Sequence, residues 1–153
     1  MENTKTITIA DVMTKSVISV DVSMTINGAA KMMEDTKVGA IIVMENNVPA
    51  GIVTDRDFTI KVGSHAYSIT DSIKKIMTPT LFSINSDESI RIASDMMHQV
   101  GVRKLPVIDN DKVVGIITAT DIVNLLAVCG EDDMRDMYYH SVVKIYSNYS
   151  PYN

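Results

Sequence analysis

The sequence predicts an α/β fold, of the α+β kind, made of two copies of one β-α-β-β-α repeat followed by an amphipathic helix. Three observations predict this fold. The chain repeats itself at an offset of 64 residues, as positions 13 and 77 show. Each copy alternates short β-prone runs with helical patterns. A further helical pattern with no repeat partner follows the second copy.

The internal repeat can be followed without a gap from Met13 to Asp57. Met13-Thr14 returns as Met77-Thr78. The same offset aligns Ser19 with Ser83, Ile26 with Ile90, Ala29 with Ala93, Met32-Met33 with Met96-Met97, Val38 with Val102, Val43 with Val107, Gly51-Ile52 with Gly115-Ile116, Thr54 with Thr118, and Asp57 with Asp121. We therefore expect repeats over residues 9–64 and 73–128 and a helical tail over residues 131–149.

Each repeat is expected to open with a short strand and continue into a helix. The strands are predicted at Val17 to Val20 and Leu81 to Ile84. Ser23 and Asp87 are the predicted helix N-caps. The helices follow from apolar residues at helical spacing, which are Ile26, Ala29, Ala30 and Met33 in the first copy and Ile90, Ala93, Met96 and Met97 in the second.

A β-hairpin and a short helix complete each repeat. The hairpin turns are Glu45-Asn46-Asn47 and Asp109-Asn110-Asp111. The strands flanking these turns are expected at Ala40 to Met44, Val48 to Val53, Leu105 to Ile108 and Val113 to Ile117. The short helices begin at Asp55 in the first copy and at Ala119 in the second. Gly63 to Ser68 is the expected loop between the two copies. Ile9-Ala10-Asp11-Val12, which matches Ile73-Lys74-Lys75-Ile76, begins the first copy.

The tail has one apolar face. Its apolar residues recur at helical spacing and are Met134, Tyr138, Val142, Ile145 and Tyr149. Such a face needs a partner surface. The pattern leaves two partners open, which are the chain's own domain and a second subunit.

Composition restricts the classes of function. The chain has 153 residues, 46% of them hydrophobic, and a net charge of −5, which makes nucleic acid an unfavourable general partner. One cysteine, Cys129, allows no internal disulfide and fits the cytoplasm. The longest apolar run, near Ala40 to Met44, is too short to cross a membrane, and we expect no membrane insertion.

The sequence contains no metal-binding or catalytic motif. His65, His98 and His140 lack ligand spacing, and Asp109-x-Asp111 lacks the rest of a calcium loop. Nucleophile elbows and phosphate loops are also missing. We therefore expect no metal site, no catalytic residue and no enzyme.

Two Thr-x-x-Asp pairs stand where a strand meets a helix, at Thr54/Asp57 and Thr118/Asp121. They can be read as helix starts, in which Thr caps and Asp answers the helix dipole. They can also be read as ribose sites, in which Asp accepts two hydroxyl hydrogen bonds beside a helix N-terminus that faces phosphate. Spacing does not decide between these readings.

Arg103-Lys104 precedes a buried strand, where the first copy has Gly39-Ala40. Unpaired cations pointing inward there would be costly, so one side chain either extends to solvent or the pair binds phosphate. The two copies therefore cannot offer electrostatically equal sites.

These residues resemble the CBS domain family, arranged as a tandem pair of the Bateman type, over about residues 9 to 128. The resemblance lies in Met77-Thr78-Pro79, in Arg103 to Asp109, in Val114 to Ile122, and in Gly51-Ile52-Val53-Thr54-Asp55-Arg56-Asp57. It implies two repeats packed about a pseudo-two-fold axis. It also implies that AMP, ADP or ATP, with or without magnesium, or S-adenosylmethionine or a related thioether, binds in the cleft between the copies.

Carried over residue by residue, the resemblance implies two ligand sites that cross between copies. Site one would comprise Thr54, Arg56, Asp57, Lys74, Thr80, Leu81, Phe82, Val102, Arg103 and Lys104. Site two would comprise Ser16, Val17, Ile18, Val38, Gly39, Ala40, Thr118, Thr120 and Asp121. Asp57 would hold ribose and Arg103 phosphate, so site one should prefer phosphate-bearing ligands.

Two functions from different classes remain open. The first is a regulatory sensor of an adenosine nucleotide, acting on an enzyme or transporter in trans. The second is a ligand-free dimerisation or docking module. Both agree with a homodimer, since closed two-fold dimers are the commonest assembly. Titration with adenosine ligands separates the two functions.

Overall fold

The structure is a computed structural model, and it describes residues 7–79, 81–126, 128 and 138–147. It forms two compact units. One, the first-repeat unit, is Ser16–Leu81. The other, the second-repeat unit, combines Met1–Lys15 with Phe82–Asn153. Each unit has its own apolar core, and each is described separately below.

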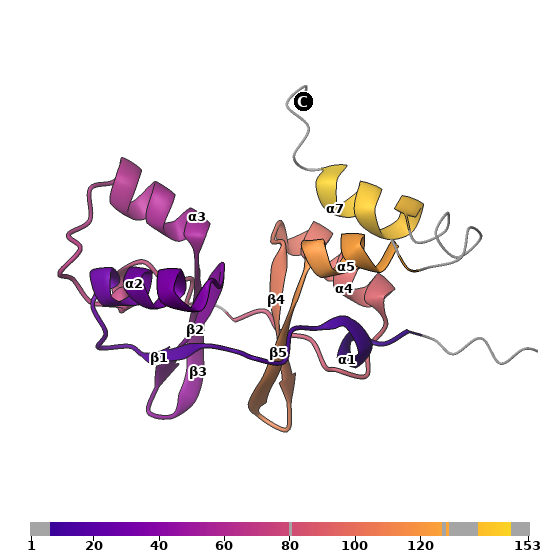
Figure 1. The fold of residues 1–153 in the computed structure, drawn as a ribbon, viewed down its shortest axis with the longest axis horizontal. Coiled ribbons are helices and arrows are strands. Elements are labelled where there is room, and N and C mark those ends of the chain that lie inside the picture. The colour runs from indigo at the N-terminus through magenta and orange to yellow at the C-terminus, as the bar shows by residue number, and fades with distance from the viewer. Residues whose placement is uncertain (1–6, 80, 127, 129–137, 148–153) are drawn as a thin grey trace, which may run out of the picture. The chain divides into compact units, whose positions relative to one another are not determined.

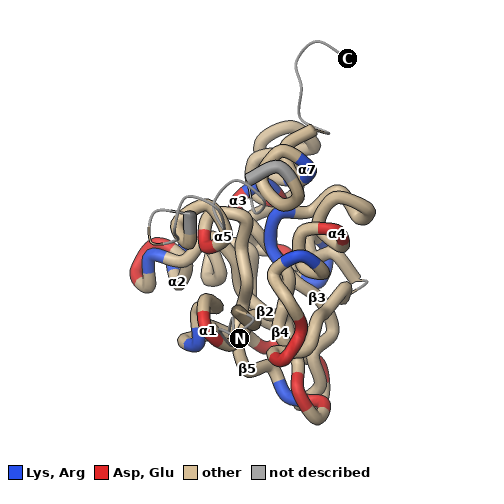
Figure 2. The backbone as a smooth tube through the Cα atoms, turned by 90° about the vertical axis from the view of Figure 1, so that its right-hand side faces the viewer, with Lys and Arg blue, Asp and Glu red and all other residues tan. Residues whose placement is uncertain are grey.

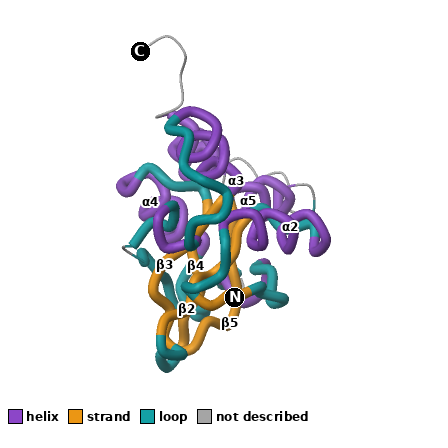
Figure 3. Tube along the Cα trace, turned by 90° about the vertical axis from the view of Figure 1, so that its left-hand side faces the viewer, coloured by secondary structure: helices purple, strands orange, loops and turns teal. Residues whose placement is uncertain are grey.

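In the first-repeat unit a three-stranded sheet packs with helix α2 (Ile26–Thr36) (Figures 1 and 3). Strand β1 (Ser19–Asp21) pairs in parallel with β2 (Ala40–Glu45), which pairs antiparallel with β3 (Val48–Thr54). After β3 come α3 (Asp55–Asp57), a π-helical segment (Phe58–Ser64) and a 3-10 helix (Ile73–Lys75). The core includes Val20, Ile26, Ile41, Val43, Val53, Ile73 and Ile76.

The second-repeat unit repeats this plan with a smaller sheet. Helix α4 (Ile90–Val100) precedes the antiparallel hairpin of β4 (Lys104–Asp109) and β5 (Lys112–Thr118), and α5 (Ala119–Leu126) follows. The core includes Ile9, Ile90, Met97, Leu105, Val107, Ile117, Ile122 and Ile145. Both hairpins turn through two residues of positive φ, Asn46-Asn47 and Asn110-Asp111, which is the turn that matches strand twist.

The predicted strand Leu81 to Ile84 does not form among the described residues. Only Ile84 pairs, in a parallel bridge to Val107 that corresponds to the Val20 and Val43 pair of the first repeat. In the first repeat the Val22 N–H continues the ladder by donating to the Met44 carbonyl at 2.9 Å. In the second repeat the matching Ser86 N–H donates instead to the Asp109 carboxylate at 3.0 Å, which ends the ladder.

The N-caps predicted at Ser23 and Asp87 are wrong by two residues. The caps are Thr25, whose Oγ1 accepts from the Gly28 N–H at 3.0 Å, and Ser89, whose Oγ accepts from the Ile92 N–H at 3.4 Å. Ser23 is engaged elsewhere, because its N–H and Oγ both donate to Asp21 Oδ1, at 2.9 and 2.5 Å.

The segment that opens each repeat packs in the unit of the other repeat. Helix α1 (Ile9–Val12) lies in the second-repeat unit, where the Ile9 N–H donates to the Glu88 carbonyl at 2.9 Å. Thr14 then pairs with Ile116 of β5. The matching segment around Ile73 lies in the first-repeat unit, where Thr78 pairs with Ile52 of β3. Sequence offset alone predicted the match of these segments but not this exchange.

Glycines on β3 and β5 make room for the exchanged segments. An alanine Cβ at Gly51 would lie 2.5 Å from the Thr78 carbonyl oxygen. At Gly115 it would lie 2.5 Å from Met13 Sδ and 2.9 Å from the Thr14 carbonyl oxygen. Both repeats therefore use glycine where a Met-Thr pair crosses a strand, and this explains why Met-Thr and Gly recur together at the 64-residue offset.

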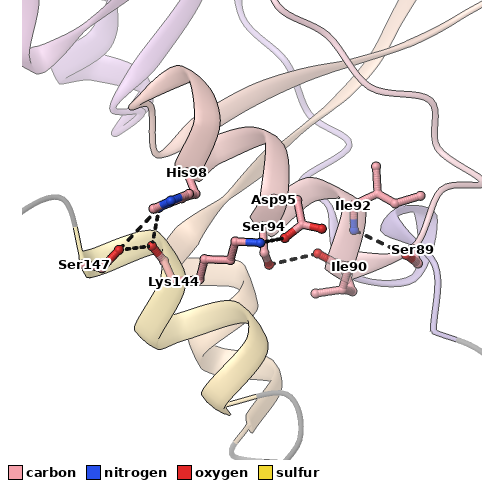
Figure 4. Close-up of polar contacts among 8 residues, drawn as sticks. All are labelled: Ser89, Ile90, Ile92, Ser94, Asp95, His98, Lys144 and Ser147. Carbon is pink, nitrogen blue, oxygen red and sulfur yellow. Dashed lines mark hydrogen bonds and ion pairs between the residues drawn. The ribbon is translucent and has the colours of Figure 1, made fainter.

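The C-terminal tail packs on its own unit over the part that is described. A π-helical segment (Tyr138–Val143) continues into α7 (Lys144–Tyr146). Ile145 is 2% exposed within the second-repeat core, with Val142 and Tyr146 against it. Lys144 Nζ lies 2.5 Å from Asp95 Oδ1, and the Lys144 carbonyl lies 2.8 Å from His98 Nδ1 (Figure 4). Met134 and Tyr149 of the predicted face lie outside the described residues.

Candidate functional site

Both Thr-x-x-Asp pairs form the same hydrogen-bonded turn at the end of a hairpin. The Thr54 N–H and Oγ1 donate to Asp57 Oδ2 at 2.8 and 2.9 Å. The Thr118 N–H and Oγ1 donate to Asp121 Oδ2 at 2.8 and 2.7 Å. The Asp121 N–H also donates to Thr118 Oγ1 at 3.1 Å. The helix-start reading of these pairs is therefore confirmed.

The capping geometry leaves one oxygen of each carboxylate outside the Thr bonds. In the first repeat Asp57 Oδ1 lies 3.1 Å from Lys61 Nζ, and the Lys61 ammonium also donates to the Ile76 carbonyl. In the second repeat the Asp121 carboxylate contacts only Thr118 among the described residues. The two turns thus differ in how many acceptor positions remain open.

The start of each hairpin lies beside the turn of its own repeat. The Ala119 N–H donates to the Arg103 carbonyl at 2.9 Å, and the Asp55 N–H donates to the Gly39 carbonyl at 3.3 Å. Lys104 is the register partner of Thr118. The basic segment at the start of β4 is among the blue positions in Figure 2. The backbone of Arg103 and Lys104 therefore adjoins the Thr118–Asp121 turn, whereas Gly39 and Ala40 take these positions beside the Thr54–Asp57 turn.

The C-terminal helix contacts the first of these cations. The Arg103 guanidinium lies 5.4 Å from the centre of the Tyr146 ring. A cation at this distance from an aromatic face is attracted by the ring quadrupole. Tyr146, whose role sequence periodicity did not indicate, therefore helps to orient Arg103.

The predicted site residues fall into two groups by unit. The first-repeat unit holds Ser16, Val17, Ile18, Val38, Gly39, Ala40, Thr54, Arg56, Asp57, Lys74 and Leu81. The second-repeat unit holds Phe82, Val102, Arg103, Lys104, Thr118, Thr120 and Asp121. Thr80 lies outside the described residues. The pairing of these groups into two crossed sites stays a prediction.

Lys74 lies apart from the turn with which it was grouped. Its Nζ lies 2.6 Å from Glu45 Oε1, at the end of β2 next to the hairpin turn. Thr54 pairs with Ala40 at the opposite end of the same strand. Five residue steps along a strand span about 16 Å. The ion pair therefore holds Lys74 away from the Thr54–Asp57 turn.

Two aspartates at strand ends have lowered pKa values. Hydrogen bonds from Ser23 lower the pKa of Asp21, and hydrogen bonds from Ser86 lower the pKa of Asp109. Both aspartates end strands, β1 and β4 respectively. Their shifts follow from local turn bonding, which is a structural cause rather than a sign of a functional site.

Two further features limit what the described residues can do. No group of three or more His, Cys, Asp or Glu among them is placed to hold a metal ion. Within the same part of the chain, no helix is both long and apolar enough to span a membrane. The polar groups at and beside the two turns are the carboxylate acceptors of Asp57 and Asp121 and the cations of Arg103 and Lys104.

Comparison with known proteins agrees with the repeat and its turns. The profile of the family described as CBS domain matches residues 9–63 and 73–128. The chain belongs to the CBS domain family. The two matched stretches cover most of the chain and include both Thr-x-x-Asp turns. The expected fold, an α+β arrangement of two CBS repeats, is confirmed.

Similar proteins include stand-alone CBS proteins. The CBS domain-containing protein YhcV of Bacillus subtilis is 34% identical over 114 residues, which cover 74% of this chain and 81% of YhcV. The CBS-domain containing protein ATU1752 of Agrobacterium tumefaciens has a TM-score of 0.72 at 26% identity, over 81% of this chain and 96% of that one.

One solved neighbour was crystallised with ligands. The CBS domain pair of protein MJ0100, in complex with 5′-methylthioadenosine and S-adenosyl-L-methionine, has a TM-score of 0.73 at 23% identity. The match covers 80% of this chain and 98% of that one. At this identity the likeness shows a shared fold.

Proposed function

We propose that this CBS pair is a regulatory module that binds an adenosine-containing ligand and is not itself an enzyme. The observation that supports this most directly is the pair of Thr-x-x-Asp turns. In each, two Thr donors hold one carboxylate oxygen of Asp57 or Asp121. Where the other oxygen carries no contact among the described residues, as at Asp121 Oδ1, it can accept from a ribose hydroxyl without rearranging. The adenosine compounds bound by the MJ0100 pair belong to the same chemical class.

The charge beside the turns bears on which adenosine compound binds. Arg103 and Lys104 can make charge-assisted hydrogen bonds to phosphate, whereas Gly39 and Ala40 cannot. We propose that AMP, ADP or ATP, with or without magnesium, binds where Arg103 contributes. A less charged compound such as S-adenosylmethionine suits a site built on Gly39. The signal would reach an enzyme or transporter in trans, in the cytoplasm.

The first prediction concerns ligand binding by the intact chain. AMP, ADP, ATP and S-adenosylmethionine are titrated separately by calorimetry, and thermal melting is followed in parallel. A ligand at about 100 times its Kd stabilises the folded state by roughly 2.7 kcal/mol, which for a chain of this size raises Tm by several degrees. At least one of the four ligands should produce both signals.

A double variant, Asp57→Asn with Asp121→Asn, serves as the specificity test. Asparagine keeps an oxygen for the Thr donors but loses the charge that favours hydroxyl donors, so affinity should fall about tenfold or more. Asp87→Asn, at an exposed aspartate ahead of α4, is the matched control and should bind normally. Absence of any heat or melting shift at millimolar ligand would favour the ligand-free docking module instead.

The second prediction concerns assembly. We propose a homodimer, since closed two-fold dimers are the commonest assembly of soluble chains. The C-terminal helix does not supply the argument, because Ile145 is buried in its own unit. One chain has a mass of 16.8 kDa, and light scattering at micromolar concentration should give twice that mass. A monomeric mass, with or without AMP, would contradict the proposal.

A further inference from the structure

The two repeats differ at the residue four positions after the site aspartate. In the first repeat this residue is Lys61, and in the second it is Leu125. Lys61 Nζ lies 3.1 Å from Asp57 Oδ1, and both side chains are largely covered, with 27% and 15% of their surfaces exposed. Leu125 instead packs against the apolar core of its unit. The offset of 64 residues therefore aligns an ammonium with an aliphatic side chain.

We propose that Lys61 closes the Asp57 carboxylate to ligand, so that the ribose diol of an adenosine ligand is accepted at Asp121. This rests on the proposed function and states which of the two turns performs it. It departs from the expectation that Asp57 holds the ribose of the tighter-binding ligand. Lys61 and Leu125 are specificity-determining residues in this account, since neither is needed to form the Thr-x-x-Asp turn.

The number of occupied acceptor positions supports the proposal. An ionised carboxylate accepts through about four lone-pair positions. Asp57 uses two of them for Thr54 and a further one for the Lys61 ammonium. Asp121 uses positions on Oδ2 alone among the described residues, which leaves Oδ1 for two hydroxyl donors.

Lys61 is held in place by a second contact. Its ammonium also donates to the Ile76 carbonyl, so the Lys61 side chain spans from the turn to the segment after the 3-10 helix. A diol that binds at Asp57 would have to displace a charge-assisted hydrogen bond, which corresponds to roughly tenfold or more in affinity. No such displacement is needed at Asp121.

The cations reinforce the choice of Asp121. Arg103 lies in the same unit as Asp121, and its carbonyl accepts from Ala119 within the Thr118–Asp121 turn. Its guanidinium lies over the Tyr146 ring at 5.4 Å. Asp121 and Arg103 thus come from adjoining backbone segments of one repeat.

The test exchanges the two residues and uses AMP as the probe. Calorimetric titration is performed on the wild type, Lys61→Leu, Lys61→Arg and Leu125→Lys, with 2′,3′-dideoxy-AMP as the ligand that lacks the diol. Asp57→Asn and Asp121→Asn are titrated alongside. Far-ultraviolet circular dichroism and thermal melting establish that each variant is folded, and Leu125→Met controls for disturbance of the half-buried Leu125 position.

The expected results follow from which carboxylate is open. Asp121→Asn should weaken AMP about tenfold or more and remove the preference over the dideoxy compound, whereas Asp57→Asn should change affinity less than about twofold. Lys61→Leu should add a second, diol-dependent binding event, and Lys61→Arg should not, because the charge is kept. Leu125→Lys should weaken AMP about tenfold or more, with Leu125→Met near wild type.

Two outcomes would overturn the proposal in distinguishable ways. Wild-type protein that binds AMP but loses it in Asp57→Asn and keeps it in Asp121→Asn would overturn this inference while the proposed function stands. Loss of AMP binding in Lys61→Leu would have the same meaning, since it would make Lys61 a ligand contact. Wild-type protein that binds none of the adenosine probes would overturn the proposed function as well.

Discussion

Ile145→Ala should lower the free energy of unfolding by about 2 to 5 kcal/mol, the range for removing a fully buried branched aliphatic side chain. Ile145 is 2% exposed and belongs to the core cluster of the second-repeat unit, together with Ile9, Met97 and Ile122. The truncation removes apolar contacts and leaves a cavity that the surrounding residues fill only in part. Urea denaturation followed by circular dichroism measures the loss.

Val143→Ala is the matched control because Val143 lies two residues before Ile145, at the start of α7, and is 44% exposed. It should change the free energy of unfolding by less than about 0.5 kcal/mol. The nearby pair of Lys144 and Asp95 is about two-fifths exposed, and such pairs contribute little. Equal, small effects of Ile145→Ala and Val143→Ala would mean that the tail does not stabilise its own unit and would restore the second subunit as its partner.

Gly51→Ala should destabilise the first-repeat unit by about 1 to 3 kcal/mol, the usual cost of overpacking a close contact. The added Cβ would lie 2.5 Å from the Thr78 carbonyl oxygen and 3.1 Å from Met77 Sδ. The carbonyl is backbone and pairs with Ile52, so relieving the overlap weakens the Ile52 and Thr78 hydrogen bonds of 2.9 and 3.3 Å. Thermal melting and urea denaturation both report the change.

Gly63→Ala provides the comparison. Gly63 lies in the π-helical segment Phe58–Ser64, and an added Cβ would come no closer than 3.9 Å to the Phe58 carbonyl oxygen. Alanine has the higher helix propensity, so this substitution should be neutral or stabilising by up to about 1 kcal/mol. A Gly51→Ala protein as stable as Gly63→Ala would show that Met77-Thr78 does not cross β3 as closely as described.

Local features of the sequence were enough to predict the repeat and most of its elements. The Asn46-Asn47 and Asn110-Asp111 turns tolerate positive φ, so the two hairpins form where they were expected. Helix N-caps were misplaced because several Ser, Thr and Asp residues precede each helix. The structure shows that the Ser23 hydroxyl donates to the Asp21 carboxylate and does not cap α2.

The contacts of Lys61 with Ile76 and of Tyr146 with Arg103 could not be predicted because they join distant parts of the chain. Lys61 contacts the nearby Asp57 carboxylate and the Ile76 carbonyl, which is 15 residues away along the chain. The Tyr146 ring lies against the guanidinium of Arg103, which is far away along the chain. Periodicity marks a residue as apolar-facing or exposed, but it does not report which side chain lies opposite.

The sequence by itself determined the duplication, the order of most strands and helices, and the two Thr-x-x-Asp turns, because these depend on spacing and on bonds between near neighbours. Only the tertiary structure decided that the segment opening each repeat packs in the unit of the other repeat, that Gly51 and Gly115 admit those segments, and that Ile145 is buried in its own unit. Several surfaces of similar apolar character could cover each of these segments. The one that does is chosen by close packing, which depends on the shape of the folded chain.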